Sequence, residues 1–402
     1  MTATRDALNA FLDYAQAAVS SSPEGPLMGL TLAVKDIYDV AGYPTGGGNP
    51  QRGAESGIAR TTAPAIQALL DAGARFLGKT QTDELAYSMI GMNAHFPAPV
   101  NPRARDRVTG GSSSGSAAAV AGGLADIAIG SDTNGSIRVP ASFCGLVGLR
   151  TTHGRISMQG AMPLAPSFDT FGWFARDIAT YAAVGDVLLG ADSHEVPLAR
   201  PVRIAEMETL LFGQEERTAY GAMLRRVLER FERPAGFLAL PCPTGELFEH
   251  FKEIQAHEAW QAHGAFLSRG ERGLGPGVRE RFAYARSVSA ATAEAAHRFR
   301  RDVIADFTAL MDPDMVVVLP SAPSAAPLKI ATQPEFDAYR EKAAPLTCLA
   351  GMLGWPQITL PLGEVHGAPF GISLLGPPGS DRQLIRLAAA ILARGGDPAW
   401  TR

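Results

Sequence analysis

The stretch from Thr109 to Gly154 decides the fold that we expect: TGGSSSGSAAAVAGGLADIAIGSDTNGSIRVPASFCGLVGLRTTHG. It divides in order into a Gly/Ser loop at 110–116, a run of small residues at 117–125, an apolar run at 127–129 and a second Gly/Ser loop at 130–136. The small residues favour a tightly packed helix, and the short apolar run is typical of a buried strand. Because one helix and one strand can bring the second loop back beside the first, Ser112 and Ser136 are candidates for one site.

The composition of the chain indicates a globular protein and argues against two classes of partner. The 402 residues are 46% hydrophobic, which is ample for a sizeable core, and the net charge is -4 without any basic block. We therefore expect no nucleic acid and no membrane surface as a partner. No apolar run approaches the ~20 residues of a membrane span, and the N-terminus lacks the charged and apolar regions of a signal peptide.

The cysteines and histidines predict neither a disulfide framework nor a metal centre. Cys144, Cys242 and Cys348 are odd in number, far apart and outside any CxxC motif, which is typical of reduced thiols. The histidines between positions 250 and 263 share one helical region without the spacing of metal ligands. We therefore expect a cytoplasmic protein that uses no metal and no cofactor.

Strand and helix patterns alternate along the chain, which predicts an α/β fold. We expect a single domain, residues 1–402, in which helices cover both faces of a large mixed β-sheet. Its expected parts are an N-terminal packing helix at 5–20, a core at 29–200, a mostly helical region at 202–311, and strands and a helix at 315–392. Strands are predicted at 29–37, 74–77, 202–205, 236–241, 315–320, 357–362 and 371–375, and helices at 64–73, 83–90, 177–189, 278–311 and 381–392.

Residues 73–80 match the P-loop pattern GxxxxGK[ST], with Lys79 at the phosphate-binding position. A P-loop must follow a strand and expose the backbone N–H groups of its interior. Here a helical pattern precedes the motif, and its interior is the apolar Ala-Arg-Phe-Leu, so we expect a short strand and then a turn at 78–80. Nucleotide binding through Lys79 is the alternative that the motif leaves open.

Residues 111–115 match GxSxG, the nucleophile elbow of α/β-hydrolases, with Ser113 as the nucleophile. That elbow connects a strand to a helix, whereas the polar segment 101–107 cannot form a buried strand. His153 and His366 are the available partners for such a serine, and neither has a clear acidic neighbour in a suitable context. An esterase that uses Ser113 is therefore a second alternative.

Lys35 ends an apolar strand pattern and has two interpretations. It either extends its ammonium group to solvent, or it is buried with a lowered pKa and acts as a neutral amine base. Ser136 ends the tight loop Asp132-Thr133-Asn134-Gly135, in which successive N–H groups can converge on an anion. The combination of Lys35, Ser112 and Ser136 favours nucleophilic catalysis over separate structural roles.

The chain resembles the amidase signature family in several motifs that occur in the family's order. They are Ala33-Val34-Lys35-Asp36, Gly78-Lys79-Thr80 with Asp83-Glu84, Gly110 to Ala117, Gly130 to Ala141, Leu319-Pro320 with Pro323, and Pro361-Leu362-Gly363. The resemblance covers nearly the whole chain and explains the accidental P-loop match. It implies an amide hydrolase that forms an acyl-enzyme without a metal.

The resemblance also implies a Ser–cis-Ser–Lys triad. Ser136 would be the nucleophile, and Ser112 would connect it to the base Lys35 through a cis peptide bond after Gly111. The oxyanion would be stabilised by the backbone N–H groups of Thr133, Asn134, Gly135 and Ser136. Residues expected at the substrate are Ser88 and Met89, and residues expected to support the loops are Gly111, Ser113, Asp132 and Arg138.

The short indole-3-acetamide hydrolases are the most similar subgroup, on the phrases Gly47-Gly48-Asn49-Pro50 and Ala86-Tyr87-Ser88 with Asn93-Ala94-His95. They imply a small apolar or aromatic primary amide as the partner. Walls are expected from 42–50, 86–96, 158–173 and 202–311, with an apolar surface from Met89, Met92, Phe96, Met158, Met162, Phe168, Phe171 and Trp173. Asn134 replaces the glycine of many members, so it either narrows the oxyanion loop or places a side chain near the substrate.

Two further expectations concern assembly. The family includes subunits of glutamine-hydrolysing amidotransferases, so such a subunit is a third alternative for this chain. A homodimer is the oligomeric state that we expect if the chain acts alone.

Overall fold

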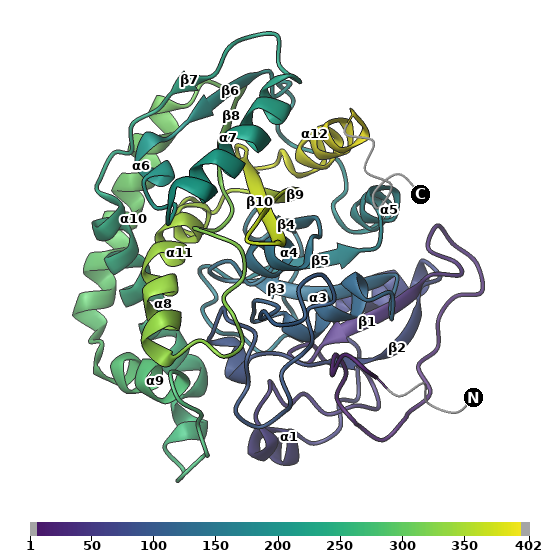
Figure 1. The fold of residues 1–402 in the computed structure, drawn as a ribbon. Helices are drawn as coiled ribbons and strands as arrows, with labels where there is room; N and C mark the ends of the chain where they lie inside the picture. Colours follow the sequence, from purple (N-terminus) through teal and green to yellow (C-terminus); the bar gives the residue numbers. More distant parts are fainter. Residues whose placement is uncertain (1–5, 395–402) are drawn as a thin grey trace.

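The computed structural model describes residues 6–394 and contains two mixed β-sheets with helices packed around them (Figure 1). The first sheet has the order β2-β1-β3-β5, made of β1 Thr31–Lys35, β2 Arg75–Thr80, β3 Ile127–Asp132 and β5 Thr170–Ala175. β1 is parallel to both β2 and β3, and β5 is antiparallel to β3. Every residue of β3 and β5 is buried, as is usual for strands that are covered on both faces.

The second sheet has the order β4-β9-β10-β8-β6-β7. Its strands are β4 Gly148–Arg150, β6 Arg200–Arg203, β7 Gly236–Phe237, β8 Met315–Pro320, β9 Gln357–Val365 and β10 Ala368–Leu375. β10 pairs antiparallel with β8 and β9, whereas β6 pairs parallel with β7 and β8. The α/β class is therefore confirmed, but the backbone forms two sheets where one was expected.

Side-chain hydroxyls explain why the two sheets do not merge. β4 and β5 are neighbours, but the backbone N–H of Leu149 donates to the hydroxyl of Tyr181 (2.7 Å) instead of to β5. The hydroxyl of Thr151 donates to the carbonyl of Phe171 (3.1 Å). These buried side chains satisfy the backbone groups that a continuous ladder would have used.

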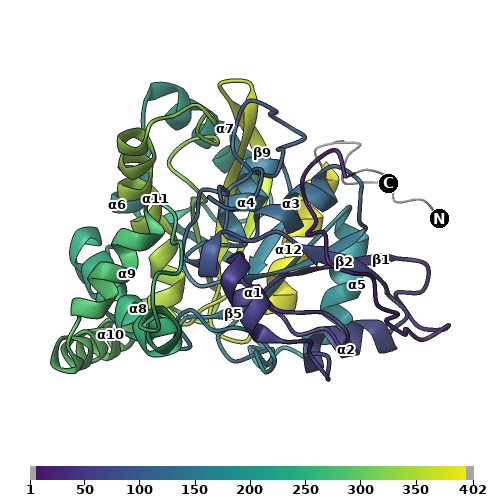
Figure 2. The same ribbon diagram turned by 90° about the horizontal axis from the view of Figure 1, so that it is seen from below.

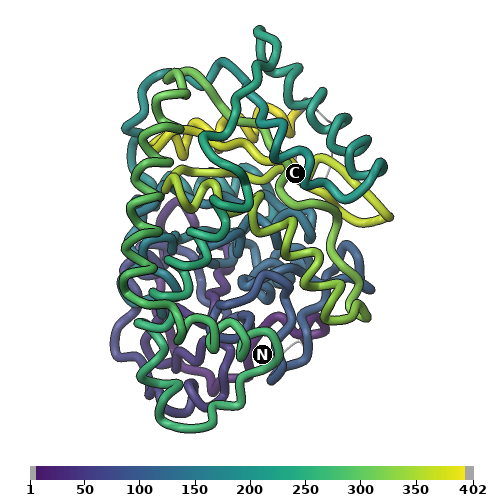
Figure 3. The backbone as a smooth tube through the Cα atoms, turned by 90° about the vertical axis from the view of Figure 1, so that its left-hand side faces the viewer, coloured from purple at the N-terminus to yellow at the C-terminus, as the bar shows by residue number. Residues whose placement is uncertain are grey.

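Helices cover both sheets. Their bounds are α1 Pro50–Ser56, α2 Pro64–Asp71, η1 Glu84–Ala86, α3 Ser114–Ala121, α4 Arg138–Cys144, α5 Ile178–Leu188, α6 Ala205–Glu208, α7 Gln214–Leu228, α8 Thr244–Leu267, α9 Val278–Ser287, α10 Ala290–Leu310, α11 Gln333–Leu353 and α12 Asp381–Arg394. Figures 1 and 2 show α8, α9 and α10 together on the side away from β1 and β2. Figure 3 views that side, with the N-terminal part of the chain below and the C-terminal strands above.

The N-terminal packing helix predicted at 5–20 is wrong for its described part, residues 6–20, and residue 5 lies outside the described residues. This segment runs along the edge strand β2, where Phe11 forms an antiparallel bridge with Thr80. The N–H of Leu12 donates to the carbonyl of Lys79, and the N–H of Gln81 donates to the carbonyl of Ala10 (both 2.9 Å). Pairing with an exposed strand edge satisfies the backbone better than a short isolated helix would.

Other boundaries differ where local patterns are ambiguous. The turn predicted at 78–80 is the end of β2, and the helix predicted at 83–90 shrinks to η1. Leu85 and Ala86 have positive φ angles (49° and 58°), which interrupts any longer helix. The strand β5, the short helix α1 and the long helix α11 were not predicted, whereas β8, α2, α5 and α12 confirm the periodic patterns.

Candidate active site

Lys35, at the carboxyl end of β1, is buried among three serine hydroxyls. Its Nζ lies 2.8 Å from Oγ of Ser112, 3.1 Å from Oγ of Ser113 and 2.9 Å from Oγ of Ser131. The side chain is 0% exposed, so this lysine does not reach solvent. β1 lies between β2 and β3, and Ser131 projects from the adjacent end of β3. The sequence prediction brought Lys35 and Ser112 together but assigned no role to Ser131.

The electrostatic surroundings of Lys35 favour a neutral amine. Burial lowers the pKa of its ammonium group to about 7, although the carboxyl groups of Asp83, Asp169 and Asp132 act in the opposite direction. Among residues 6–394, no carboxylate forms an ion pair with Lys35. A substantial fraction of the side chain is therefore uncharged at neutral pH and can accept a proton.

The loop that carries Ser112 is held closely by Asp83. The peptide bond between Gly111 and Ser112 is cis, as the resemblance implied. A Cβ atom at position 111 would lie 2.3 Å from Oδ2 of Asp83, so only glycine fits there. The N–H of Asp83 donates to the carbonyl of Ser112 (3.1 Å), and its Oδ2 accepts from the N–H of Gly91 (2.9 Å). Asp83 belongs to one of the motifs shared with the family, but no pattern in the sequence predicted its contact with this loop.

The second loop is shaped around the buried carboxylate of Asp132. Oδ1 accepts from the N–H of Gly135 (2.8 Å), and both oxygens accept from the guanidinium of Arg138 (2.8 and 2.9 Å). Arg150 donates to Oδ1 and to the carbonyl of Asp132 (3.3 and 2.7 Å). Burial alone would raise the pKa of the Asp132 carboxyl, but the two arginines outweigh it and hold the pKa well below its usual range.

These contacts decide which N–H groups of the loop can meet an oxyanion. The N–H of Gly135, which was expected to be an oxyanion donor, is already bonded to Asp132. Among the described residues, no acceptor engages the N–H groups of Thr133, Asn134 or Ser136. Gly135 is therefore a shaping residue of the loop in this structure, and three of the four predicted donors are free.

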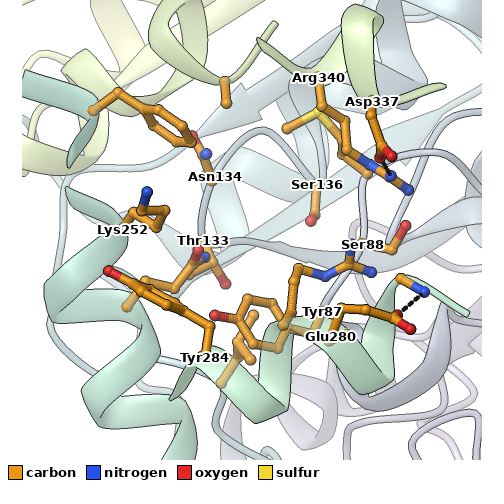
Figure 4. A pocket seen from close by; sticks show the side chains of 18 of the residues that line it. Tyr87, Ser88, Thr133, Asn134, Ser136, Lys252, Glu280, Tyr284, Asp337 and Arg340 are labelled. Carbon is orange, nitrogen blue, oxygen red and sulfur yellow. Dashed lines mark hydrogen bonds and ion pairs between the residues drawn. The ribbon is translucent and has the colours of Figure 1, made fainter. Parts of the chain in front are cut away.

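Ser136 opens onto a cavity of about 580 Å³, which we call the Ser136 cavity. Its walls are formed by Ala86, Tyr87, Ser88, Met89, Thr133, Asn134, Ser136, Leu164, Phe248, Lys252, Gln255, Pro276, Gly277, Glu280, Arg281, Tyr284, Gln333, Asp337, Arg340 and Ala344. Figure 4 shows the Ser136 hydroxyl directed into this space, between Thr133 on one side and Ser88 on the other. Ser88, Met89, Thr133 and Asn134 therefore line the same cavity as Ser136.

The side chain of Asn134 turns toward α11. Its Oδ1 accepts a hydrogen bond from the hydroxyl of Thr347 (2.7 Å). Asn134 also lines the cavity, so it joins the loop at 132–136 to a helix that was not predicted. This contact gives a structural reason for a side chain where many relatives have glycine.

The cavity walls differ from the predicted ones. Segment 86–96 contributes through residues 86–89, and 158–173 contributes through Leu164, but 42–50 contributes nothing. Of the eight apolar side chains predicted at the substrate, only Met89 lines the cavity, and Phe168, Phe171 and Trp173 belong to the core with 0% exposure. The predicted region 202–311 contributes through α8, α9 and the residues between them, whereas the contribution of α11 was not predicted.

The structure does not support the two alternative sites. Ser113 is fully buried and bonds to Lys35 and Ser131, whereas His153 contacts the carbonyl of Pro166. His366 lies against Glu216, so no histidine among the described residues reaches Ser113. Lys79 is buried within β2 and pairs with Asp36 (3.1 Å), so the P-loop interpretation is wrong.

Comparisons with known proteins agree with this geometry. The family described as Amidase matches residues 2–218 of the chain. "Amidase 1" of Arabidopsis thaliana is 35% identical, over 97% of this chain and 99% of its own length. A solved structure described as "Crystal structure of amidase" is 30% identical and superposes with a TM-score of 0.82, over 92% of this chain and 86% of its own.

The prediction of a cytoplasmic location is wrong in view of another relative. "Outer envelope protein 64, chloroplastic" of Arabidopsis thaliana is 32% identical, over 95% of this chain and 70% of its own length. Its name places that protein at an organelle envelope, so similarity at this level does not determine a cellular location. Within residues 6–394, none of the helices combines the length and apolar character needed to cross a membrane.

The family match covers more than half of the chain, and the identity to Amidase 1 extends over nearly all of it. The cavity, the buried lysine and the two serine loops occupy that matched region together with the helices that follow it. On this evidence the chain belongs to the amidase signature family and is an amide-hydrolysing enzyme.

Proposed function

We propose that Ser136 is the nucleophile of amide hydrolysis, and that Ser112 and Lys35 remove its proton. The observation that carries this proposal is the 2.8 Å contact between Nζ of Lys35 and Oγ of Ser112, made by a lysine with no exposure to solvent. A neutral amine beside a hydroxyl is a base that can act at neutral pH. Ser136, on the adjacent loop, is largely buried, but its hydroxyl faces the cavity in which a substrate would lie.

The contact between Lys35 and Ser112 supports the following sequence of steps. Oγ of Ser136 attacks the amide carbonyl carbon while its proton passes to Oγ of Ser112, and the Ser112 proton passes to Nζ of Lys35. The N–H groups of Thr133, Asn134 and Ser136 stabilise the oxyanion, each by about 3 kcal/mol if it is aligned. The carbon–nitrogen bond then breaks, and the proton returns through Ser112 to the leaving ammonia. Water attacks the acyl-enzyme by the same route and releases the acid.

The substrate that we propose is a small primary amide with an apolar or aromatic body, of which indole-3-acetamide is a representative. Support comes from the side chains of Tyr87, Met89, Leu164, Phe248 and Tyr284 in the cavity walls. A cavity of about 580 Å³ accommodates an aromatic ring of this size with its side chain. The products are the corresponding acid and ammonia.

Replacement of the nucleophile is the direct test. Ser136→Ala should lower kcat/KM for phenylacetamide and indole-3-acetamide by about 10⁴-fold or more, because no second nucleophile can form the acyl-enzyme. A fluorophosphonate probe should label Ser136 in the parent enzyme, as shown by peptide mass spectrometry. Retention of most activity in Ser136→Ala, or labelling of Ser113 instead, would refute the assignment.

A further inference from the structure

Arg281, near the start of α9, is a cavity-lining cation without an anionic partner. Among residues 6–394, no hydrogen bond or ion pair engages its guanidinium, and its Nε is buried without an acceptor. The guanidinium lies over the ring of Tyr87, 5.6 Å from the ring centre. Buried polar groups normally have partners, so an unpaired guanidinium in a cavity indicates a group that binds there.

The other charges of the Ser136 cavity are largely compensated within the protein. Lys252 pairs with Glu249 (2.7 Å), which lies outside the cavity walls. Arg340 donates to Asp337 (2.7 Å), and Glu280 accepts from the N–H of Gly277. The lining cations Lys252, Arg281 and Arg340 exceed the lining carboxylates Glu280 and Asp337 by one, and Arg281 is the one of these three cations that forms no ion pair with a carboxylate of residues 6–394.

Arg340 provides a second hydrogen-bond donor without an acceptor in this cavity. Its Nε is also buried without an acceptor, although its Nη1 is occupied by Asp337. Burial lowers the pKa of Arg281 to about 10, and the nearby charge of Arg340 acts in the same direction, while Asp83 and Asp337 oppose it. The Arg281 guanidinium thus stays charged at neutral pH, and two cavity-lining arginines each have an Nε–H without an acceptor.

We propose that Arg281, assisted by Arg340, binds a carboxylate on the substrate, so that the preferred substrates are amides of dicarboxylic acids in which one carboxyl group is free. A planar guanidinium matches a carboxylate with two parallel hydrogen bonds, which makes this anion the fitting one. The apolar side chains of the cavity would contact the body of the substrate between the amide and the carboxylate. Hydrolysis breaks the carbon–nitrogen bond of the amide, consumes one water and releases a dicarboxylate and an ammonium ion. This inference rests on the proposed function and refines its substrate.

The test compares amides that differ only in the anionic group. Succinamate, glutaramate, adipamate and para-carboxyphenylacetamide are each measured against the amide that has a methyl group in place of the carboxylate. For at least one pair, kcat/KM should be about 10-fold or more higher for the amide that carries the carboxylate than for its methyl counterpart. This difference should arise from a lower KM, while kcat stays similar. In Arg281→Met, the ratio of the two kcat/KM values for that pair should fall roughly 10- to 100-fold.

Arg286→Met is the matched control. Arg286 lies on the same helix over an aromatic ring, 5.8 Å from the centre of the Trp260 ring, but it is exposed and outside the cavity walls. This variant should keep the ratio within about twofold of the parent value. An equal loss in both variants, or no preference for any carboxylate in the parent, would overturn the proposal.

A charge-reversed variant addresses the case in which Arg281→Met folds poorly. Arg281→Asp should favour amides that end in an amino group over those that end in a carboxylate, which is a gain that misfolding cannot produce. Absence of this reversal in a variant with parental circular dichroism would contradict the proposal. Ser136→Ala distinguishes failure of the proposed nucleophile from failure of the proposed carboxylate site. If this variant still hydrolyses the methyl-ended amides, Ser136 is not the nucleophile. If hydrolysis depends on Ser136 but the parent enzyme shows no preference for a carboxylate, only the role of Arg281 is refuted.

Discussion

At the scale of single residues, the protonation of Lys35 should control the pH dependence of the reaction. Its pKa, lowered by burial to about 7, means that the neutral base is lost as the pH falls through that value. We expect kcat/KM for a neutral amide to rise about tenfold per pH unit below pH 7 and to level off above it. Steady-state kinetics from pH 5 to 10 measure this directly.

Lys35→Arg is the companion variant, because a guanidinium cannot become neutral in this range. It should be inactive at every pH while circular dichroism shows a folded protein. A parent profile that follows an ordinary lysine pKa near ~10.4 would contradict the assignment of the base.

Gly111 is the second residue for which a single substitution can be predicted, here from the space around its Cα atom. Because a Cβ atom would lie 2.3 Å from Oδ2 of the buried Asp83, Gly111→Ala must displace either the carboxylate or the serine loop. We expect a loss of about 1–3 kcal/mol in the free energy of unfolding and a large loss of activity. Urea denaturation and kinetics check this, with Gly245→Ala as the control, because a Cβ there meets nothing within 4 Å. Similar stability of the two variants would show that the contact is not tight.

At the scale of elements, the Asp132 cluster joins the end of β3 to α4 and β4. Asp132→Asn removes the charge that compensates Arg138 and Arg150, both buried, and should cost about 3–5 kcal/mol in the free energy of unfolding. Asp312→Asn, which affects an exposed partner of Arg200, should cost less than about 1 kcal/mol. Equal effects in the two variants would argue against a buried network.

The same cluster gives a pH dependence of known sign. The pKa of Asp132 in the folded protein lies below its usual value, so the stabilising contribution is complete above the unfolded-state pKa of about 3.9 and is lost as the pH falls below it. The stability difference between the parent and Asp132→Asn should therefore shrink in acid. Denaturation at pH 3 and pH 7 measures it.

The elements that the sequence predicted correctly are those with a strong local period. β8 is a run of Val and Leu buried over nearly its whole length, and α12 repeats its apolar residues with helical spacing. The N-terminal segment had the same helical period, but pairing with β2 overrode it. The helix α11 was not predicted because a proline, Pro345, lies inside it, and proline normally ends a helix.

The site was predictable to the extent that it rests on short motifs. Lys35, Ser112 and Ser136 were recognisable in the two loops and the preceding strand, and the Lys35–Ser112 contact agrees with that prediction. The charged side chains of the cavity wall could not be predicted in the same way, because Arg281 and Arg340 come from helices that meet only in the folded chain. No local pattern distinguishes a cavity-lining arginine from an ordinary surface arginine.

At the scale of the whole molecule, Tyr181 links the two sheets where they adjoin. Tyr181→Phe keeps the stack on Trp173 but leaves the buried N–H of Leu149 without its acceptor. We expect a loss of about 1–3 kcal/mol in the free energy of unfolding, measured by urea denaturation. Hydrogen exchange should report faster exchange at the Leu149 amide, and unchanged exchange there would contradict the role of this hydroxyl.

The three hydroxyls around Lys35 impose a rule on the positions of hydrogen atoms. An ammonium group has three hydrogens and can donate to all three serines, whereas the neutral amine has two hydrogens and one lone pair. Loss of the proton therefore obliges one serine to rotate its own hydrogen toward the nitrogen. The hydroxyl hydrogen of Ser113 is already directed to the carbonyl of Ser131 (3.3 Å). Only Ser112 and Ser131 can therefore donate a hydroxyl hydrogen to the lone pair of the Lys35 amine. Deprotonation of the lysine thus reorients the hydroxyl network, and the Ser131 side chain sets how often Ser112 is the group that turns.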